Sequence, residues 1–139
     1  MINMPNDKGL YNFFYFSLSL LFVAVVLEWS YKDTKITFEE DGLKIHGMYG
    51  GFCSWDEMKN LELKDSLPTI QLKVNGSSLC GKLKGHFRTK ELGNIKLFLN
   101  KRISPFIYFD LNGKKIIFNL ANSETTKLAY EILLEKTKM

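Results

Sequence analysis

The sequence predicts a mainly β fold: a small antiparallel barrel of about six to seven strands, capped by one C-terminal α-helix and preceded by an N-terminal transmembrane helix. Three observations lead to this fold class. They are an uncharged apolar stretch near the N-terminus, several short alternating segments between turn signals, and one amphipathic pattern at the end of the chain. With 139 residues, 45% of them hydrophobic and 24% charged, the chain has the composition of one globular domain.

The apolar stretch from Leu10 to Leu27 contains no charged residue. At 1.5 Å per residue it is roughly 27 Å long as a helix, close to the bilayer hydrocarbon thickness of about 30 Å. Aromatic residues lie at both of its ends, from Tyr11 to Phe16 and at Trp29, as in interfacial belts. We therefore expect a transmembrane helix over about residues 10–29, within a membrane anchor of residues 1–33 that precedes a β domain of residues 34–139.

Two other interpretations of this stretch remain open. A cleaved signal peptide typically has a shorter apolar core, a more basic start than the single Lys8, and small residues before its cleavage site. A buried core helix needs other helices around it, because the stretch is apolar on every side.

The residues around the apolar stretch favour a single-pass protein of the cell membrane with its C-terminal domain in the cytoplasm. Lys8 precedes the stretch. The lysines that follow it are Lys32, Lys35 and Lys44. Cys53 and Cys80 are too few for a disulfide framework and have no metal or haem spacing, so we expect two reduced thiols, which agrees with a reducing compartment.

From Thr34 the apolar residues alternate with polar ones, which predicts strands. Asp41-Gly42 indicates a two-residue hairpin turn, with Phe38 on the first strand opposite Ile45 on the second. Glycines at 47, 50 and 51 predict a bend before a third strand near residues 52–55. The next apolar positions, which continue toward Pro68, are Met58, Leu61 and Leu63.

Asn75-Gly76 is the second strong turn signal. A two-residue loop there places Leu72 opposite Leu79 and Ile70 opposite Gly81. A further strand is expected after Gly93 and before Lys101-Arg102; its apolar positions are Ile95, Leu97 and Leu99.

The last third of the chain predicts a hairpin covered by a helix. Asn112-Gly113 joins strands 106–111 and 114–120, with Phe109 opposite Ile116 and Ile107 opposite Phe118. Asn122 or Ser123 can cap a helix that ends at about Lys136. The residues predicted to face the sheet, at helical spacing, are Thr125, Leu128, Ala129, Ile132 and Leu133.

A basic ladder is the sharpest functional candidate in the sequence. Between residues 71 and 102 there are eight Lys or Arg residues and one acid, Glu91. Five basic residues alternate along one predicted strand: Lys82, Lys84, His86, Arg88 and Lys90. On an extended strand they share one face, and near an anionic bilayer each cation gains about 1 kcal/mol. The alternative is an ordinary solvated face that protects a sheet edge.

No motif predicts catalysis, a metal site or a cofactor. The chain lacks the glycine-rich nucleotide loops and the GxSxG nucleophile motif, and its histidines and cysteines have no chelating spacing. Nucleic-acid binding is not expected beside a membrane anchor. We predict a non-catalytic, membrane-anchored interaction module for a protein or anionic lipid partner. The alternative is a membrane-bound enzyme, such as a hydrolase that uses Cys53 with a histidine.

Residues 34–139 resemble bacterial PH-like domains, several of which lie next to transmembrane segments. The resemblance lies in Trp55-Asp56-Glu57-Met58, in the final hairpin with its helix, and in residues around the ladder: Gly81, Gly85, Phe87 and Gly93. It implies a PH-like barrel and an interaction role. In PH domains that bind phosphoinositides the first turn is basic, whereas here it reads Glu39-Glu40-Asp41-Gly42, which repels phosphate.

Overall fold

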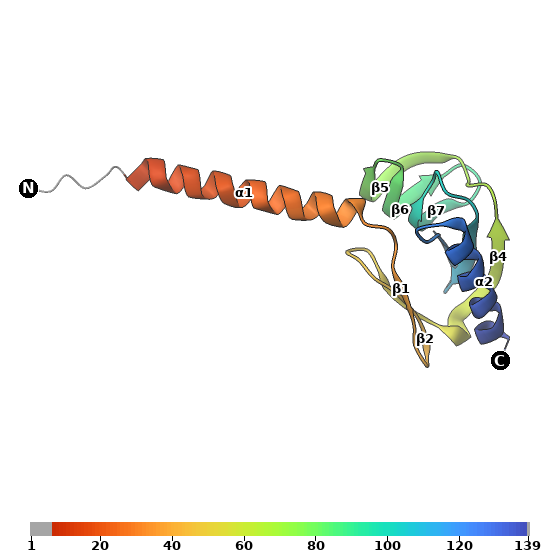
Figure 1. The fold of residues 1–139 in the computed structure, drawn as a ribbon. Helices are drawn as coiled ribbons and strands as arrows, with labels where there is room; N and C mark the ends of the chain where they lie inside the picture. The colour runs from red at the N-terminus through yellow and green to blue at the C-terminus, as the bar shows by residue number, and fades with distance from the viewer. Residues whose placement is uncertain (1–6, 139) are drawn as a thin grey trace, which may run out of the picture.

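The computed structural model describes residues 7–138 as one long N-terminal helix, α1, that leads into a β domain (Figure 1). The side chain of Trp29, predicted to lie at the membrane interface, falls outside the described part. The elements are α1 (Asp7–Tyr31), β1 (Ile36–Phe38), β2 (Gly42–Ile45), β3 (Gly51–Ser54), a 3-10 helix η1 (Trp55–Glu57), β4 (Met58–Lys64), β5 (Ile70–Leu79), β6 (Lys82–Thr89), β7 (Gly93–Asn100), β8 (Phe106–Leu111), β9 (Lys114–Phe118) and α2 (Ser123–Thr137).

The β domain consists of two open sheets, which confirms the mainly β fold with a C-terminal helix but not the predicted closed barrel. Strands β1, β2 and β3 form one sheet, and the other has the order β4-β8-β9-β7-β6-β5. The described residues thus hold nine strands, more than the sequence predicts. The pairing of β7 with β9 is parallel, which departs from the predicted all-antiparallel arrangement. This pairing joins strands that are separated in sequence by β8, and no local pattern specifies it.

The first hairpin has a different register from the predicted one. Phe38 pairs with Leu43 rather than Ile45, and the N–H of Glu39 donates to the carbonyl of Gly42 at 2.8 Å. The two turn residues are therefore Glu40 and Asp41. Gly42 is instead the first residue of β2. A glycine is needed there because β3 lies close by: a Cβ would be 2.2 Å from the Cys53 carbonyl oxygen.

The β5–β6 hairpin turns five residues later than predicted. Strand β5 continues through Asn75-Gly76, and the turn lies at Cys80-Gly81, whose φ values are +51° and +83°. Leu72 consequently pairs with Arg88, and Leu79 pairs with Lys82. Gly76 does not form a turn. It allows the backbones of β5 and β6 to approach closely, since a Cβ on it would lie 2.2 Å from the Lys84 carbonyl oxygen.

The closing hairpin agrees with its prediction. Ile107 pairs with Phe118, and Phe109 pairs with Ile116. Asn112 and Gly113 have φ values of +51° and +80°, as a type I′ turn requires.

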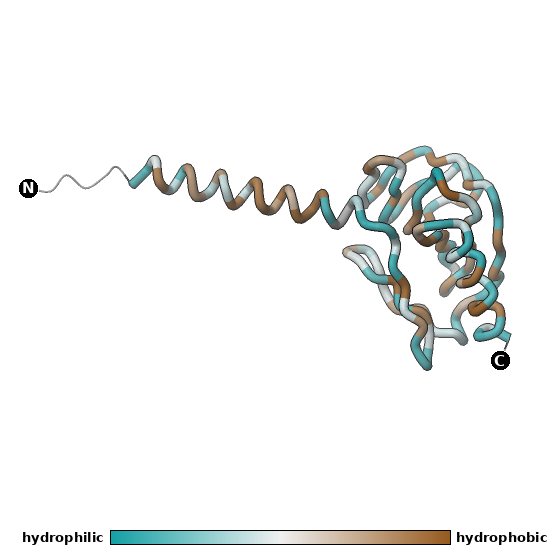
Figure 2. The backbone as a smooth tube through the Cα atoms, in the orientation of Figure 1, coloured by the Kyte–Doolittle hydropathy of each residue, from teal (hydrophilic) through white to brown (hydrophobic). Residues whose placement is uncertain are grey.

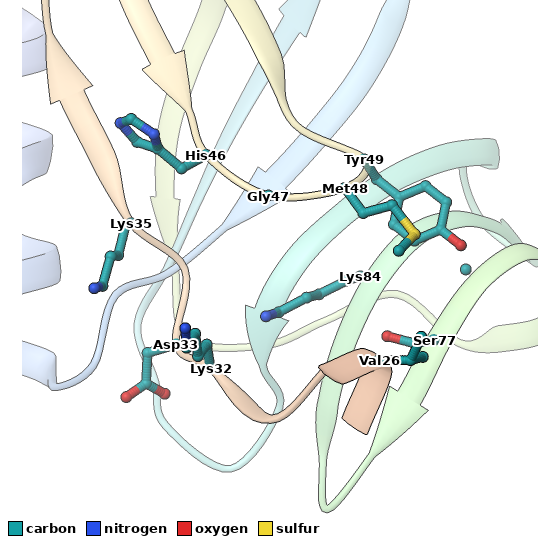
Figure 3. A pocket seen from close by; sticks show the side chains of 11 residues that line it. Val26, Lys32, Asp33, Lys35, His46, Gly47, Met48, Tyr49, Ser77 and Lys84 are labelled. Atoms are coloured by element: carbon teal, nitrogen blue, oxygen red, sulfur yellow. The ribbon is translucent and has the colours of Figure 1, made fainter. Parts of the chain in front are cut away.

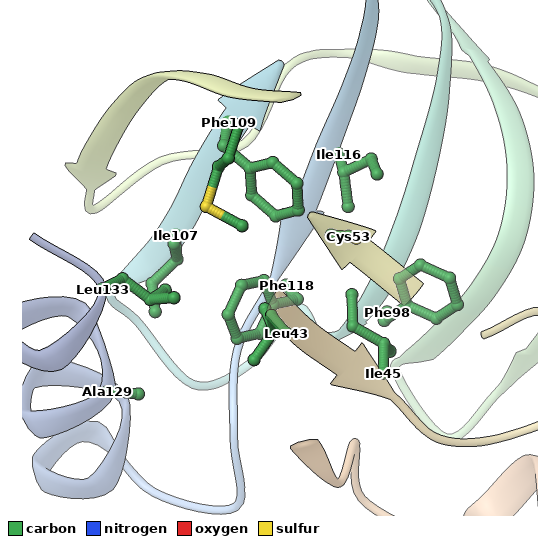
Figure 4. Close-up of a cluster of buried hydrophobic side chains, with 11 residues drawn as sticks. Leu43, Ile45, Cys53, Phe98, Ile107, Phe109, Ile116, Phe118, Ala129 and Leu133 are labelled. Atoms are coloured by element: carbon green, nitrogen blue, oxygen red, sulfur yellow. The ribbon is translucent and has the colours of Figure 1, made fainter. Parts of the chain in front are cut away.

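Apolar clusters cover both faces of the six-stranded sheet. One cluster joins the two sheets and α2 (Figure 4); its buried residues are Leu43, Ile45, Cys53, Met58, Phe98, Ile107, Phe109, Ile116, Phe118, Ala129 and Leu133. The other lies on the opposite face and consists of Leu83, Phe87, Ile95, Leu97, Leu99, Phe106, Tyr108 and Ile117. The alternation along β7, β8 and β9 divides the strand residues between these two clusters.

Helix α2 is capped as predicted, and Ala129 and Leu133 of the predicted face are buried, but that face is rotated toward Thr126. The Asn122 side chain accepts a hydrogen bond from the N–H of Thr125 at 2.8 Å. The buried residues of α2 are Thr126, Ala129 and Leu133. Leu128 and Ile132, predicted to be buried, are 60% and 38% exposed. The hydroxyl of the buried Thr126 accepts from the N–H of Leu120 and donates to the carbonyl of Asn122, so this polar group is hydrogen-bonded where the helix meets the end of β9.

Helix α1 carries apolar residues along its length and leaves them exposed (Figures 1 and 2). Its segment Asp7–Glu28 is long and apolar enough to cross a membrane, and no part of that window is buried. The core-helix interpretation is therefore wrong. A signal sequence near the N-terminus passes the same test of length and composition, so both the anchor and the signal-peptide interpretations fit this helix.

Candidate functional site

A pocket of about 510 Å³ lies where α1 meets the β domain (Figure 3). Four parts of the chain form it: the end of α1 with the linker after it, the loop between β2 and β3, strand β5, and strand β6. Its lining residues are Val26, Lys32, Asp33, Lys35, His46, Gly47, Met48, Tyr49, Gly76, Ser77 and Lys84. This volume falls within the range of about 300–1,000 Å³ that is usual for small-molecule sites.

The pocket lining is cationic. It contains the three lysines Lys32, Lys35 and Lys84. Among the described lining residues the one carboxylate is that of Asp33, which forms an ion pair with Lys82 (Nζ to Oδ1, 3.2 Å). Among the described lining residues, lysines therefore outnumber carboxylates by three to one.

Lys84 is the most enclosed of these cations, and its side chain extends toward Lys32 and Asp33 (Figure 3). Burial lowers the pKa of Lys84 below its ordinary value, and the neighbouring charge of Lys82 lowers it further. An anion in the pocket would oppose both effects, because it would compensate for the lost hydration and the repulsion between the lysines.

Apolar groups form another part of the wall. Val26 comes from α1, while Met48 and Tyr49 come from the β2–β3 loop. Met48 is 57% exposed, so its thioether side chain is available to a ligand. The pocket therefore combines cations with apolar surface, as a site for an amphipathic ligand does.

Backbone contacts hold the pocket walls together. The N–H of His46 donates to the carbonyl of Lys35 at 2.9 Å, and the His46 ring is hydrogen-bonded to the Thr37 hydroxyl at 2.6 Å. The Thr34 hydroxyl donates to the carbonyl of Phe98 at 2.8 Å. These contacts fix the linker after α1 against both sheets.

Lys82 joins the end of α1 to the β domain. Its ammonium group donates to the carbonyl of Tyr31 and lies 4.1 Å from the centre of the Tyr31 ring. With the Asp33 ion pair, these contacts give Lys82 a structural role at the C-terminal end of the helix, where a cation is favourable.

The structure confirms the predicted alternation of β6 but does not bring the five ladder residues into one site. Leu83, Gly85 and Phe87 are buried on the opposite face. Of the ladder, Lys84 lines the pocket and Lys82 holds α1.

The remaining ladder residues lie away from the pocket lining. The pKa of His86 is lowered by burial and by the nearby Lys114 and Lys96, and its ring Nδ1 lies 3.2 Å from the Lys114 ammonium. Arg88 reaches Asn94 at 3.4 Å, and Lys90 is an exposed residue beyond the end of β6.

The cysteines are free thiols, and Cys53 has the wrong environment for a nucleophile. It is 3% exposed, and burial raises its pKa to about 11, whereas catalytic cysteines have a lowered pKa. Cys80 is exposed at the β5–β6 turn. Within residues 7–138 no group of three histidine, cysteine or acidic residues is placed to hold a metal ion.

Most of the pocket could not be read from the sequence. In the sequence, Lys32 and Lys35 indicate only the membrane orientation, His46 is a histidine without chelating spacing, and no pattern marks Met48. Comparison with known protein families, with curated proteins and with solved structures finds no match to this chain. We therefore infer function from the apolar helix and the pocket at its end.

Proposed function

We propose that this chain is a single-pass membrane protein whose β domain is a non-catalytic, PH-like interaction module for an anionic partner. One observation carries the proposal: the apolar helix α1 ends at a cationic pocket, and Val26 of that helix forms part of the pocket wall. A helix that enters a membrane would place this pocket at the membrane surface.

The exposure of α1 supports membrane insertion. Large apolar side chains such as Phe13, Phe22 and Leu27 are at least half exposed. Burial of apolar surface stabilises by about 25 cal/mol for each Å², so a bilayer is a far better environment than water for this helix. The contacts of Lys82 with Tyr31 support a retained anchor, because they join the last turn of the helix to the folded domain.

A cytoplasmic β domain is supported by charge and by the thiols. More lysines follow α1 closely than precede it, as is typical of a cytoplasmic side. Cys80 is an exposed free thiol, which suits a reducing compartment.

The PH-like assignment is supported by the mainly β domain with its C-terminal helix, and the site we propose is not at the first turn. The indole N–H of Trp55 donates to the carbonyls of Glu39 and Glu40 at 3.3 and 3.1 Å, which holds an acidic turn in place. An anion is better accommodated in the pocket, whose described lining holds three lysines and one aspartate.

Membrane fractionation of the full chain, with a tag at each end, tests this proposal. We expect one polypeptide with both tags to stay in the membrane pellet after alkaline carbonate extraction. A membrane-impermeant maleimide should label Cys80 only after the membrane is permeabilised, and Cys80→Ser should abolish that labelling. Release by carbonate would contradict the anchor, loss of the N-terminal tag would indicate a signal peptide, and labelling of intact cells would reverse the orientation.

A further inference from the structure

We infer that the pocket at the end of α1 binds the phosphate headgroup of an anionic glycerophospholipid from the bilayer that contains the helix. This inference rests on the proposed function, since it requires α1 to lie in a membrane. It goes further by naming the class of ligand and the residues that would hold it.

The position of the pocket along α1 is the first support. Val26 lies within the candidate span Asp7–Glu28 and also lines the pocket. From Val26 to Tyr31 the helix rises about 7.5 Å. A hydrocarbon core of about 30 Å in a bilayer of about 40–45 Å leaves a headgroup layer of about 5–8 Å on each side. The pocket therefore lies at the depth of the headgroups.

The parts of the β domain that form the pocket lie beside the end of α1, where a lipid of the same bilayer can reach them. The loop after β2 and the hairpin of β5 and β6 both lie beside the C-terminal end of the helix (Figure 1). They supply Met48, Gly76 and Ser77 to the pocket. A lipid beside the helix can enter without leaving the bilayer surface.

The charges of the pocket favour an anion. Lys32, Lys35 and Lys84 line one pocket, and Asp33 beside them forms an ion pair with Lys82, so ammonium groups outnumber carboxylates here even when these partners are counted. The Lys32 ammonium also lies 3.3 Å from Glu28, an exposed pair that is easily exchanged for another anion. An anionic headgroup would therefore meet a net positive site and a zwitterionic one would gain less.

The apolar wall selects a lipid over a soluble phosphate. The side chains of Val26 and Met48 and the ring of Tyr49 are apolar surface, which suits the glycerol and the first methylenes of an acyl chain. A cavity of about 510 Å³ has room for a headgroup together with these groups.

Native mass spectrometry of the full chain in detergent micelles tests the inference. The probes are phosphatidylglycerol, phosphatidylcholine and inorganic phosphate, each titrated separately. We expect one phosphatidylglycerol to bind, with little binding of phosphatidylcholine and no competition from millimolar phosphate. Removing a pocket lysine should weaken binding about fivefold, so Lys35→Gln and Lys84→Gln together should weaken it about 25-fold.

A control variant with the same net charge distinguishes binding in the pocket from general attraction between the anionic lipid and a basic protein. Lys90→Gln with Lys101→Gln removes the same charge from exposed positions outside the pocket, and its affinity should stay within about twofold of the natural chain. Lys35→Gln alone, at an exposed linker residue, provides a pocket variant that leaves the fold undisturbed.

Three results would overturn the inference. They are equal losses in the pocket and control variants, displacement of the lipid by inorganic phosphate, and no bound lipid on a chain that carbonate extraction has shown to be membrane-embedded. The last result would refute the lipid site and leave the membrane anchor standing, whereas failure of carbonate extraction would remove the anchor itself.

Discussion

At the scale of single residues, environment decides what each reactive side chain can do. Cys53 and Cys80 are equivalent in the sequence, yet one is a core residue with a pKa of about 11 and the other is an exposed thiol. Lys82 and Lys84 belong to the same predicted ladder, yet one holds α1 and the other lines the pocket. Alternation along β6 was predictable, because it is local. The partners of each lysine were not, because they come from α1 and the linker.

The buried thiol predicts a loss of stability in alkali. The pKa of Cys53 rises from 9.0 to about 11 on folding, mainly by burial, so the unfolded chain releases this proton first. Stability from this group is complete below about pH 9 and is lost as the pH rises through 11, by about 3 kcal/mol in total. Burial raises the pKa of Tyr108 to about 12, which extends the same trend.

Denaturant unfolding of the full chain between pH 8 and 11 measures this effect. Cys53→Ala should be less stable at every pH, since it loses core contacts, but its free energy of unfolding should decline less steeply with pH. Tyr108→Phe should flatten the upper end of the curve. Parallel curves for the natural chain and Cys53→Ala would show that the thiol does not titrate differently on folding.

At the scale of elements, one dipeptide had two outcomes. Asn112-Gly113 forms the predicted turn, whereas Asn75-Gly76 lies inside β5. In the second case the hairpin turns at Cys80-Gly81, and Gly76 allows β6 to come close. Turn chemistry was visible in the sequence, but the distance between two strand backbones is set by the whole sheet. This difference moved the hairpin by five residues and placed Gly76 at the pocket.

Helix α2 gives a prediction at this scale, because two faces of it were compatible with helical spacing. Leu133 is fully buried, so Leu133→Ala should cost about 2–5 kcal/mol of stability. Leu128 is 60% exposed, and Leu128→Ala should change stability by less than about 0.5 kcal/mol. The two substitutions remove the same atoms from one helix, so the difference in stability between the variants, measured by thermal unfolding, shows which leucine faces the sheet. Equal destabilisation would place the predicted face, with Leu128, against the sheet after all.

At the scale of the whole molecule, the order of an apolar helix, a β domain and a closing helix could be predicted from periodicity alone. The division into two sheets and the parallel pairing of β7 with β9 could not, because both depend on contacts between distant segments. The pocket has the same origin. It combines residues near positions 26–35, 46–49 and 76–84, and only the folded chain brings these segments together.

The separation of α1 from both apolar clusters predicts that the β domain folds without it. No described residue of α1 belongs to either cluster, so deletion of residues 1–31 should give a soluble domain that unfolds cooperatively. Lys82 would lose Tyr31 but keep Asp33, and stability should fall by no more than about 1 kcal/mol. Circular dichroism and thermal unfolding measure this.

A longer deletion provides the control for that experiment. Removing residues 1–45 also takes away Leu43 and Ile45, which are buried between the two sheets, and should abolish cooperative unfolding because several kcal/mol of apolar burial are lost. If the shorter deletion aggregated as the longer one does, α1 would be part of the folding unit. A folded shorter product would show that α1 is dispensable for the core, which leaves its apolar surface and the pocket wall at Val26 as its contributions to the molecule.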